Sequence, residues 1–230
     1  MKNIKAVFCK QIKDTIKNRI ILIQFLLFPI MTLIMNNAVK INDMPENFFT
    51  ELFAVMYAGM APIVTTAAIV SEEKEKGTLR ALRMAGVKPL EYLFGIGSYV
   101  LLACMLGSVV MFLSGSYQAG IALPFLLIMA LGIFISTLMG AAVGTASRSQ
   151  MAATSLSVPL MMVFAFLPMI GMFNQTVEKI AEYTYTQQIQ HLLSNGVCGT
   201  IETSGWFILA GNGILALFLF AFAYQKNGLE

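Results

Sequence analysis

The sequence predicts an all-α membrane protein with six transmembrane helices, an N-terminal amphipathic helix and both termini in the cytoplasm. Hydrophobic residues make up 57% of its 230 positions and charged residues only 12%, whereas about a quarter of a soluble domain is charged. The apolar residues form six runs that are each long enough to cross a hydrocarbon core of about 30 Å. Lysine and arginine fall almost entirely in the segments on one side of these runs.

The first element, residues 1–19, is expected to be an amphipathic helix at the membrane surface. Its two faces differ in character, with Ile4, Val7, Phe8, Ile12 and Thr15 on one and Lys2, Lys10, Lys13 and Lys17 on the other. Such a helix lies on an anionic leaflet, so membrane lipid is its expected partner. Contact with a protein partner stays open as an added role.

Six spans follow inside the expected transmembrane domain, residues 20–224. They cover residues 20–39, 50–70, 92–113, 122–145, 153–172 and 205–224. The interior of these windows carries no charged residue, and Glu51 sits only at the edge of the second. Ion-coupled pumps use ionisable residues within the membrane, so the sequence does not favour that class of protein.

Charge distribution predicts the orientation. Thirteen of the fifteen lysines and arginines fall in segments that share one side of the membrane, and the other two are Lys40 and Lys179. Cytoplasmic loops collect these residues, so we expect both termini, including the tail 225–230, to be cytoplasmic. The basic excess therefore reports topology and gives no reason to expect a nucleic-acid partner.

Two further patterns concern the packing of the spans. The fourth span carries small residues that include Gly132, Gly140 and Gly144. Gly140 and Gly144 have the spacing that lets helices approach closely, and we expect this packing within one subunit. The outer loop 173–204 carries Val177, Ile180, Ala181 and Thr184 at helical spacing before a turn at Asn195–Gly196. This pattern predicts a short surface or re-entrant helix, which would either seal the bundle or contact a substrate.

The charged segment Ser71–Pro89 between the second and third spans is the candidate site of function. Ser71 is expected to cap a helix whose first turn carries the acidic residues Glu72, Glu73 and Glu75. Gly77 and Thr78 then predict a break and a second cap. Beyond them Leu79 and Leu82 share one side, Arg80 and Arg83 another, and Gly86 with Pro89 marks the end.

These residues carry a resemblance to a known family. Glu73, Glu75, Lys76, Gly77, Thr78 and Leu79 fit the form E-x-E-K-G-T-L, with Leu82 and the run Pro89–Tyr92 after it. The chain resembles the ABC-2 type permeases of ATP-binding-cassette transporters, in which such a loop joins the second and third of six spans. Many members carry proline just after the loop's helix, where this chain has Met84–Val87.

The resemblance implies that loop 71–91 forms a coupling helix seated in a groove of an ATPase subunit, with the inner loop 146–152 making a second contact. The implied coupling residues are Glu72, Glu73, Glu75, Lys76, Gly77, Thr78, Leu79, Arg80, Leu82, Arg83 and Arg148. The alternative is that these charges only set the topology.

The chain has no G-x-x-x-x-G-K-[ST] phosphate-binding loop, so the resemblance implies separate ATPase subunits that bind ATP and magnesium. Two ATPases would act on two permeases, a second copy of this chain or a similar one, in a bacterial or archaeal cytoplasmic membrane. We expect no catalytic, metal or cofactor site in the chain itself. An intramembrane protease would need more histidines than His191, and arginine where Gly77 stands.

The absence of a large outer domain and the abundance of methionine favour export of a hydrophobic or amphipathic drug, antimicrobial peptide or lipid-like compound. The candidate pathway residues are Phe28, Met31, Met35, Met56, Met60, Met161 and Phe164. Export of polysaccharide or teichoic acid is the family's other common use. A scaffold or sensor subunit that transports nothing would share the same fold.

Overall fold

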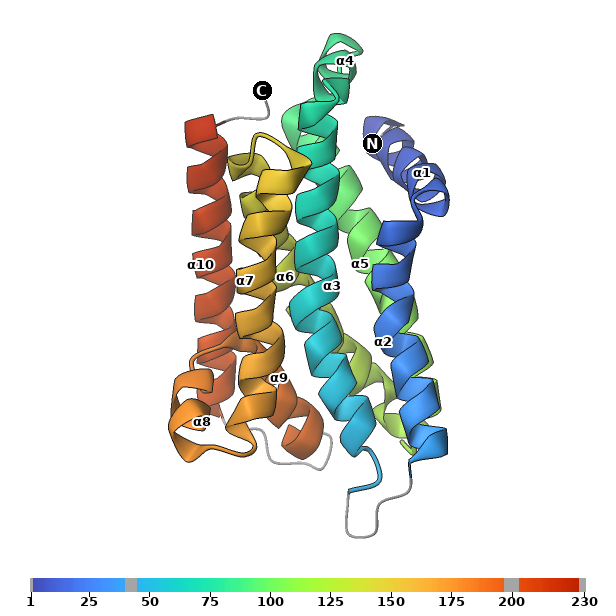
Figure 1. Ribbon diagram of the computed structural model, residues 1–230, viewed down its shortest axis with the longest axis vertical. Helices are drawn as coiled ribbons and strands as arrows, with labels where there is room; N and C mark the ends of the chain where they lie inside the picture. The colour runs from blue at the N-terminus through green and yellow to red at the C-terminus, as the bar shows by residue number, and fades with distance from the viewer. Residues whose placement is uncertain (1, 40–44, 197–202, 228–230) are drawn as a thin grey trace.

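The computed structural model describes residues 2–39, 45–196 and 203–227, and these form an all-α bundle (Figure 1). The helices are α1 Lys2–Lys17, α2 Arg19–Ala38, α3 Phe48–Glu75, α4 Thr78–Met84, α5 Pro89–Ser114, α6 Ala122–Ala146, α7 Gln150–Gly171, α8 Gln175–Ala181, α9 Tyr185–His191 and α10 Thr203–Asn227. Six of them, α2, α3, α5, α6, α7 and α10, are long and apolar enough to cross a membrane. The prediction of an all-α protein with six spans is confirmed.

Helix α3 forms the centre of the bundle. Figure 1 shows α2 and α5 on one side of it and α6 and α7 on the other, with α10 outermost against α6. Helices α1 and α4 and the last turn of α10 lie at one end of the bundle, which we call the α4 end. That this end faces the cytoplasm remains a prediction from the charge distribution.

Helix α1 packs on protein as well as presenting a charged face. Its residue Val7 is buried so tightly on α5 that a Cβ added to Gly95 would lie 2.7 Å from the Val7 side chain. The Tyr99 hydroxyl of α5 lies 2.6 Å from the Thr15 hydroxyl. The expected amphipathic helix is present, but α5 covers much of the face that the sequence predicted would meet lipid.

Small residues bring α6 against α3. A Cβ added to Gly140 would lie 2.5 Å from the carbonyl oxygen of Ile63, and one at Gly144 would lie 2.8 Å from Val70. Real Cβ contacts at such distances essentially do not occur, so glycine is what lets the two backbones touch. The prediction that these glycines pack within one subunit is confirmed.

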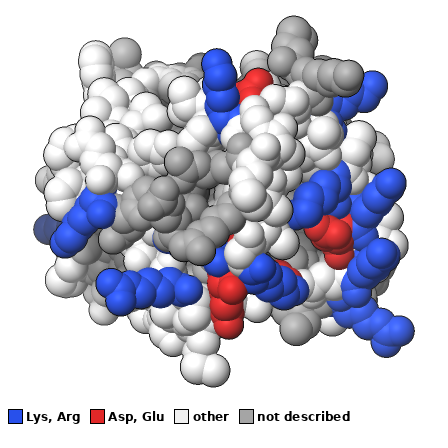
Figure 2. Space-filling model, turned by 90° about the horizontal axis from the view of Figure 1, so that it is seen from above, with Lys and Arg blue, Asp and Glu red and all other residues white. Residues whose placement is uncertain are grey.

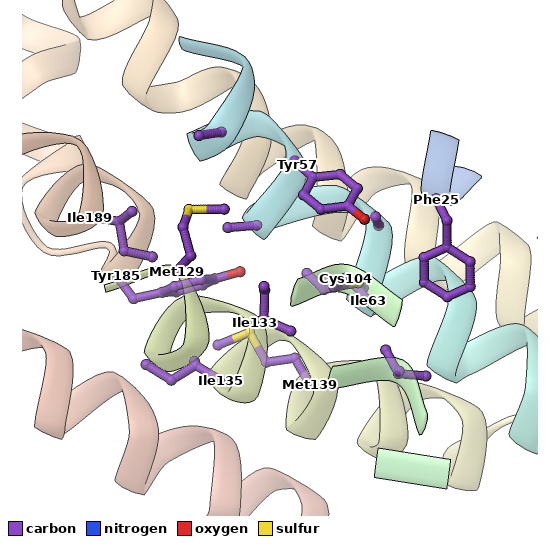
Figure 3. Close-up of a cluster of buried hydrophobic side chains, with 14 of the residues drawn as sticks. Phe25, Tyr57, Ile63, Cys104, Met129, Ile133, Ile135, Met139, Tyr185 and Ile189 are labelled. Carbon is purple, nitrogen blue, oxygen red and sulfur yellow. The ribbon is translucent and has the colours of Figure 1, made fainter. Parts of the chain in front are cut away.

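Helix α9 enters the core from the end opposite α4. Tyr185 and Ile189 are fully buried, and the Tyr185 hydroxyl lies 2.6 Å from the Ser136 hydroxyl of α6. Figure 3 shows both α9 side chains beside Met129 and Ile133 of α6. The predicted helix of the outer loop is therefore two helices: α8 at the surface and α9 within the bundle. One turn of π-helix, Leu192–Gly196, follows in place of the turn expected at Asn195–Gly196.

Candidate functional site

Basic residues gather on the surface of the α4 end. Figure 2 views the bundle from this end and shows lysine and arginine spread across it, with few acidic residues between them. The described basic residues on the elements that meet there are Lys5, Lys10, Lys13, Lys17, Arg19, Lys74, Lys76, Lys88, Arg148 and Lys226. The structure thus collects at one end the cations that the sequence assigned to one side of the membrane.

Helix α3 continues past Ser71 to Glu75 without a break. Ser71 is buried in mid-helix, where its hydroxyl donates to the carbonyl of Ala68 at 3.1 Å. The expectation that Ser71 caps a new helix is wrong. Residues 73–75 stay helical because their side chains bond to α1, α6 and α7, as described below. Thr78 does not cap α4 either, since its hydroxyl donates to the carbonyl of Glu73 and completes the end of α3.

Two glycines in the left-handed conformation bound α4. Gly77 has φ of 67° and Gly86 has φ of 81°, values that side chains with a Cβ rarely adopt. Pro89 begins α5, where its fixed φ suits the first helical position and its missing N–H has no intrahelical partner to lose. The predicted break at Gly77 and the predicted end at Gly86 are confirmed.

Glu73 faces the interior and joins α3 to α1. The residue is only 6% exposed, and one carboxylate oxygen accepts hydrogen bonds from Lys10 and from Gln11 of α1. The hydroxyl of Tyr92, at the start of α5, lies beside the same carboxylate. The resemblance placed Glu73 among the coupling residues, and in the structure its carboxylate is held by Lys10 and Gln11 of α1.

Glu75 and Lys74 join α3 to the second inner segment. The Glu75 carboxylate accepts the backbone N–H of Gln150, the first residue of α7, at 2.7 Å. The Lys74 ammonium donates to the carbonyl of Thr145, in the last turn of α6, at 2.8 Å. Arg148 lies exposed between these two contacts. The two inner segments singled out by the sequence, residues 71–91 and 146–152, are therefore in direct contact.

The remaining candidates divide between core and surface. Leu79 is buried, and Glu72, Thr78 and Leu82 are half-buried. Lys76 is exposed and pairs with Glu72 one turn earlier, and this hydrogen bond raises the pKa of Lys76. The side chains of Arg80 and Arg83 lie outside the described part of the structure.

Met84 is a residue that sequence reasoning missed. It is the last residue of α4, the helix that protrudes at the α4 end of the bundle in Figure 1, and it is 84% exposed. A protruding helix tip with an apolar side chain suits contact with an apolar pocket on another protein. The sequence could have indicated this exposure, because Met84 stands between the charged part of the segment and the Gly86 turn and lies outside the apolar spans.

The candidate pathway residues do not come together in this subunit. Phe28 and Met60 line one notch of about 30 Å³ between α2 and α3. Met56 is buried in the core, and the ring of Phe164 packs against that of Tyr185 with centroids 4.9 Å apart and planes tilted by 44°. Met31 is exposed on α2, and Met35 and Met161 are half-buried.

A larger apolar cavity lies elsewhere. It has a volume of about 440 Å³ and opens among α5, α6 and α10 in the half of the bundle nearest the α4 end. Its wall includes Phe94, Gly97, Phe134, Leu138 and Leu217. No pattern in the sequence indicates this cavity, because it comes from the separation of α5 and α10 and its apolar residues resemble those of any lipid-facing surface.

Comparison with known proteins finds one family match that covers nearly the whole chain. The sequence model of one family, described as ABC-2 family transporter protein, matches residues 2–224. No curated protein matches the chain.

Proposed function

The chain belongs to the ABC-2 family of transporter proteins, and we propose that it is the permease subunit of an ABC exporter driven by separate ATPase subunits. The observation that carries this proposal is the bonded contact between the two inner segments. Glu75 reaches the start of α7 and Lys74 reaches the end of α6, directly behind the protruding α4. An ATPase that moves α4 would therefore act on several spans at once.

The connections at the base of α4 suggest how such a movement spreads. Gly77 joins α4 to α3, the central helix of the bundle. From residues 73–75 the contacts lead to α1 through Lys10, to α6 through Thr145 and to α7 through Gln150. Rigid helices joined by specific hydrogen bonds can transmit displacement between distant sites. In this proposal α4 is the coupling helix.

The assembly proposed from this role has two permeases and two ATPases in a bacterial or archaeal cytoplasmic membrane. ATP and magnesium bind to the ATPases, and the substrate pathway forms where this chain meets a second copy or a similar permease. The exposed surface of α4, including Met84 and the neighbouring Lys76, is the part of this chain that would enter the groove of an ATPase.

The proposed substrate is a hydrophobic or amphipathic compound. Support comes from the apolar cavity of about 440 Å³, which is large enough for a small apolar molecule and opens toward the membrane-facing helices α5 and α10. A sugar polymer would need a polar lining instead. Export of a polysaccharide or teichoic acid, and a scaffold role without transport, would both appear in the assay below as a wild-type chain that does not move the amphiphile.

The first test is purification from native membranes in mild detergent with identification of bound partners. We expect an ATPase to co-purify with the wild-type chain and to be lost with Glu75→Arg, which cannot accept the Gln150 N–H and adds a cation next to Arg148. Glu46→Arg, on an exposed residue at the opposite end, is the matched control and should retain the ATPase. A wild-type chain that purifies without any ATPase would overturn the proposal.

The second test separates coupling from assembly. Gly77→Pro imposes φ near −65° on a residue that needs a positive φ, whereas Gly77→Asn introduces a residue that tolerates this conformation. In reconstituted vesicles Gly77→Pro should hydrolyse ATP without moving substrate, and Gly77→Asn should transport. Equal transport of a fluorescent amphiphile by both variants would contradict the coupling role of α4.

A further inference from the structure

A polar cavity of about 700 Å³ lies at the α4 end where α1, α2 and α3 meet. It is separate from the apolar cavity and from the contact between α3 and α7. Its wall contains the cations Lys10, Lys17, Arg19 and Lys76 and the acids Asp14, Glu72 and Glu73. The four cations outnumber the three acids, so the wall carries a net positive charge of one.

The pairing of these charges leaves one part of the cavity cationic. Lys76 pairs with Glu72, and Lys10 pairs with Glu73 and lies 3.5 Å from Asp14. Among the ion pairs of the described residues, none involves Lys17 or Arg19. These two cations stand at the junction of α1 and α2, where the first turn of α2 adds the positive end of a helix dipole. This corner favours an anion.

The bottom of the cavity is apolar and continues into the membrane-spanning part of the bundle. Ile21 of α2 and Ile69 of α3 line the cavity. One to two turns further along the same pair of helices, Leu27 and Val64 line the notch of about 30 Å³. The seam between α2 and α3 is thus cationic at the α4 end and apolar one to two turns deeper. A phospholipid has the same order, with a charged headgroup at the surface and an apolar acyl chain below it.

We propose that this cavity binds an anionic phospholipid of the surrounding bilayer. Its phosphate lies between Lys17 and Arg19, which supply the charge-assisted hydrogen bonds that phosphate oxygens prefer. One acyl chain passes Ile21 and follows the seam past the exposed side chain of Leu27. The bound lipid would brace α1 against α3 next to the Glu73 contact. This role does not depend on transport or on any ATPase.

Native mass spectrometry of the full chain in mild detergent tests the proposal, with phosphatidylglycerol as the probe. Lys17→Glu and Arg19→Glu should each weaken its binding roughly tenfold, since each removes an attraction and adds a repulsion. Lys13→Glu makes the same charge change on an exposed residue of α1 that does not line the cavity, and its binding should stay within about twofold of wild type.

A second pair of variants tests the path of the acyl chain. Leu27→Trp fills the notch and should weaken binding, whereas Leu26→Trp alters an equally exposed neighbour outside the notch and should not. Phosphatidylcholine with the same chains should bind more weakly than phosphatidylglycerol. Equal binding of these two lipids, equal loss in Lys13→Glu, or full competition by the soluble headgroup glycerophosphoglycerol would overturn the proposal.

Discussion

Glu75 and Gln150 form a hydrogen bond between the last residue of α3 and the first residue of α7. The Glu75 carboxylate accepts the Gln150 backbone N–H at 2.7 Å. The carboxylate thus accepts from one of the N–H groups that have no partner within the helix at its start. Its negative charge also interacts favourably with the positive end of the α7 dipole. A side chain at the end of α3 thus stabilises the start of a helix on the other inner segment.

Glu75→Gln should loosen the first turn of α7. The variant loses the charge that strengthens this hydrogen bond, at a cost of roughly 1 kcal/mol in local opening. Hydrogen exchange followed by mass spectrometry should show the amides that begin α7 exchanging about fivefold faster. Glu72→Gln is the control because Glu72 pairs with Lys76, four residues later at the end of the same helix, and forms no hydrogen bond or ion pair with the described residues of α7. Unchanged exchange in Glu75→Gln would show that the contact contributes nothing to α7.

Glu73→Ala should destabilise the chain and release α1. Removing this buried carboxylate leaves Lys10 and Gln11 without their shared acceptor. The loss should cost about 2 kcal/mol, below the roughly 3–5 kcal/mol of a fully buried pair, because the Lys10 side chain is 34% exposed and water can solvate it. The thermal unfolding midpoint in detergent should fall, and trypsin should cut α1 faster in the folded protein. Glu72→Ala breaks a more exposed pair and should change the midpoint little.

The Glu73 effect can be separated from a simple loss of packing. In the double variant Glu73→Leu, Lys10→Leu both charges are absent, so no buried charge remains uncompensated. Its midpoint should lie above that of Glu73→Leu alone. A double variant that is less stable than the single one would mean that the two residues do not act as a pair.

Gly140→Val should disrupt the packing of α6 on α3. The added side chain would begin 2.5 Å from the Ile63 carbonyl oxygen, which is backbone and cannot rotate away. We expect a loss of about 3 kcal/mol, measured as the unfolding midpoint in a fixed detergent. Gly211→Val makes the same change in α10, where an added Cβ meets nothing within 4 Å, and should be nearly neutral. Equal effects of the two would argue against close contact between α3 and α6.

Cys9 should report the side of the membrane on which the α4 end lies. It is exposed on α1, whereas Cys104 is fully buried. In a Cys198→Ser background, a membrane-impermeant maleimide should label the chain in permeabilised cells and leave it unlabelled in intact cells. Cys9→Ser in that background should abolish labelling. Labelling of intact cells would contradict the orientation inferred from lysine and arginine.

The sequence by itself determined the six spans, the amphipathic start and the breaks around α4. Each depends on neighbours along the chain: a run of about 20 apolar residues needs a membrane, and Gly77, Gly86 and Pro89 have backbone preferences that act wherever they stand. The same local information singled out the charged segment 71–89, and the resemblance to the ABC-2 permeases added residues 146–152, although neither could show that the two segments touch.

Only the tertiary structure decided which way the residues of the site face. Ser71 has the local preference of a cap, yet it lies inside α3 because contacts with α1, α6 and α7 extend that helix to Glu75. Glu73 turns inward for the same reason. These outcomes depend on the rotation and relative height of helices far apart in the sequence. The burial of α9 and the shapes of both cavities depend on them as well, since a cavity is a property of the space between helices and no single helix encodes it.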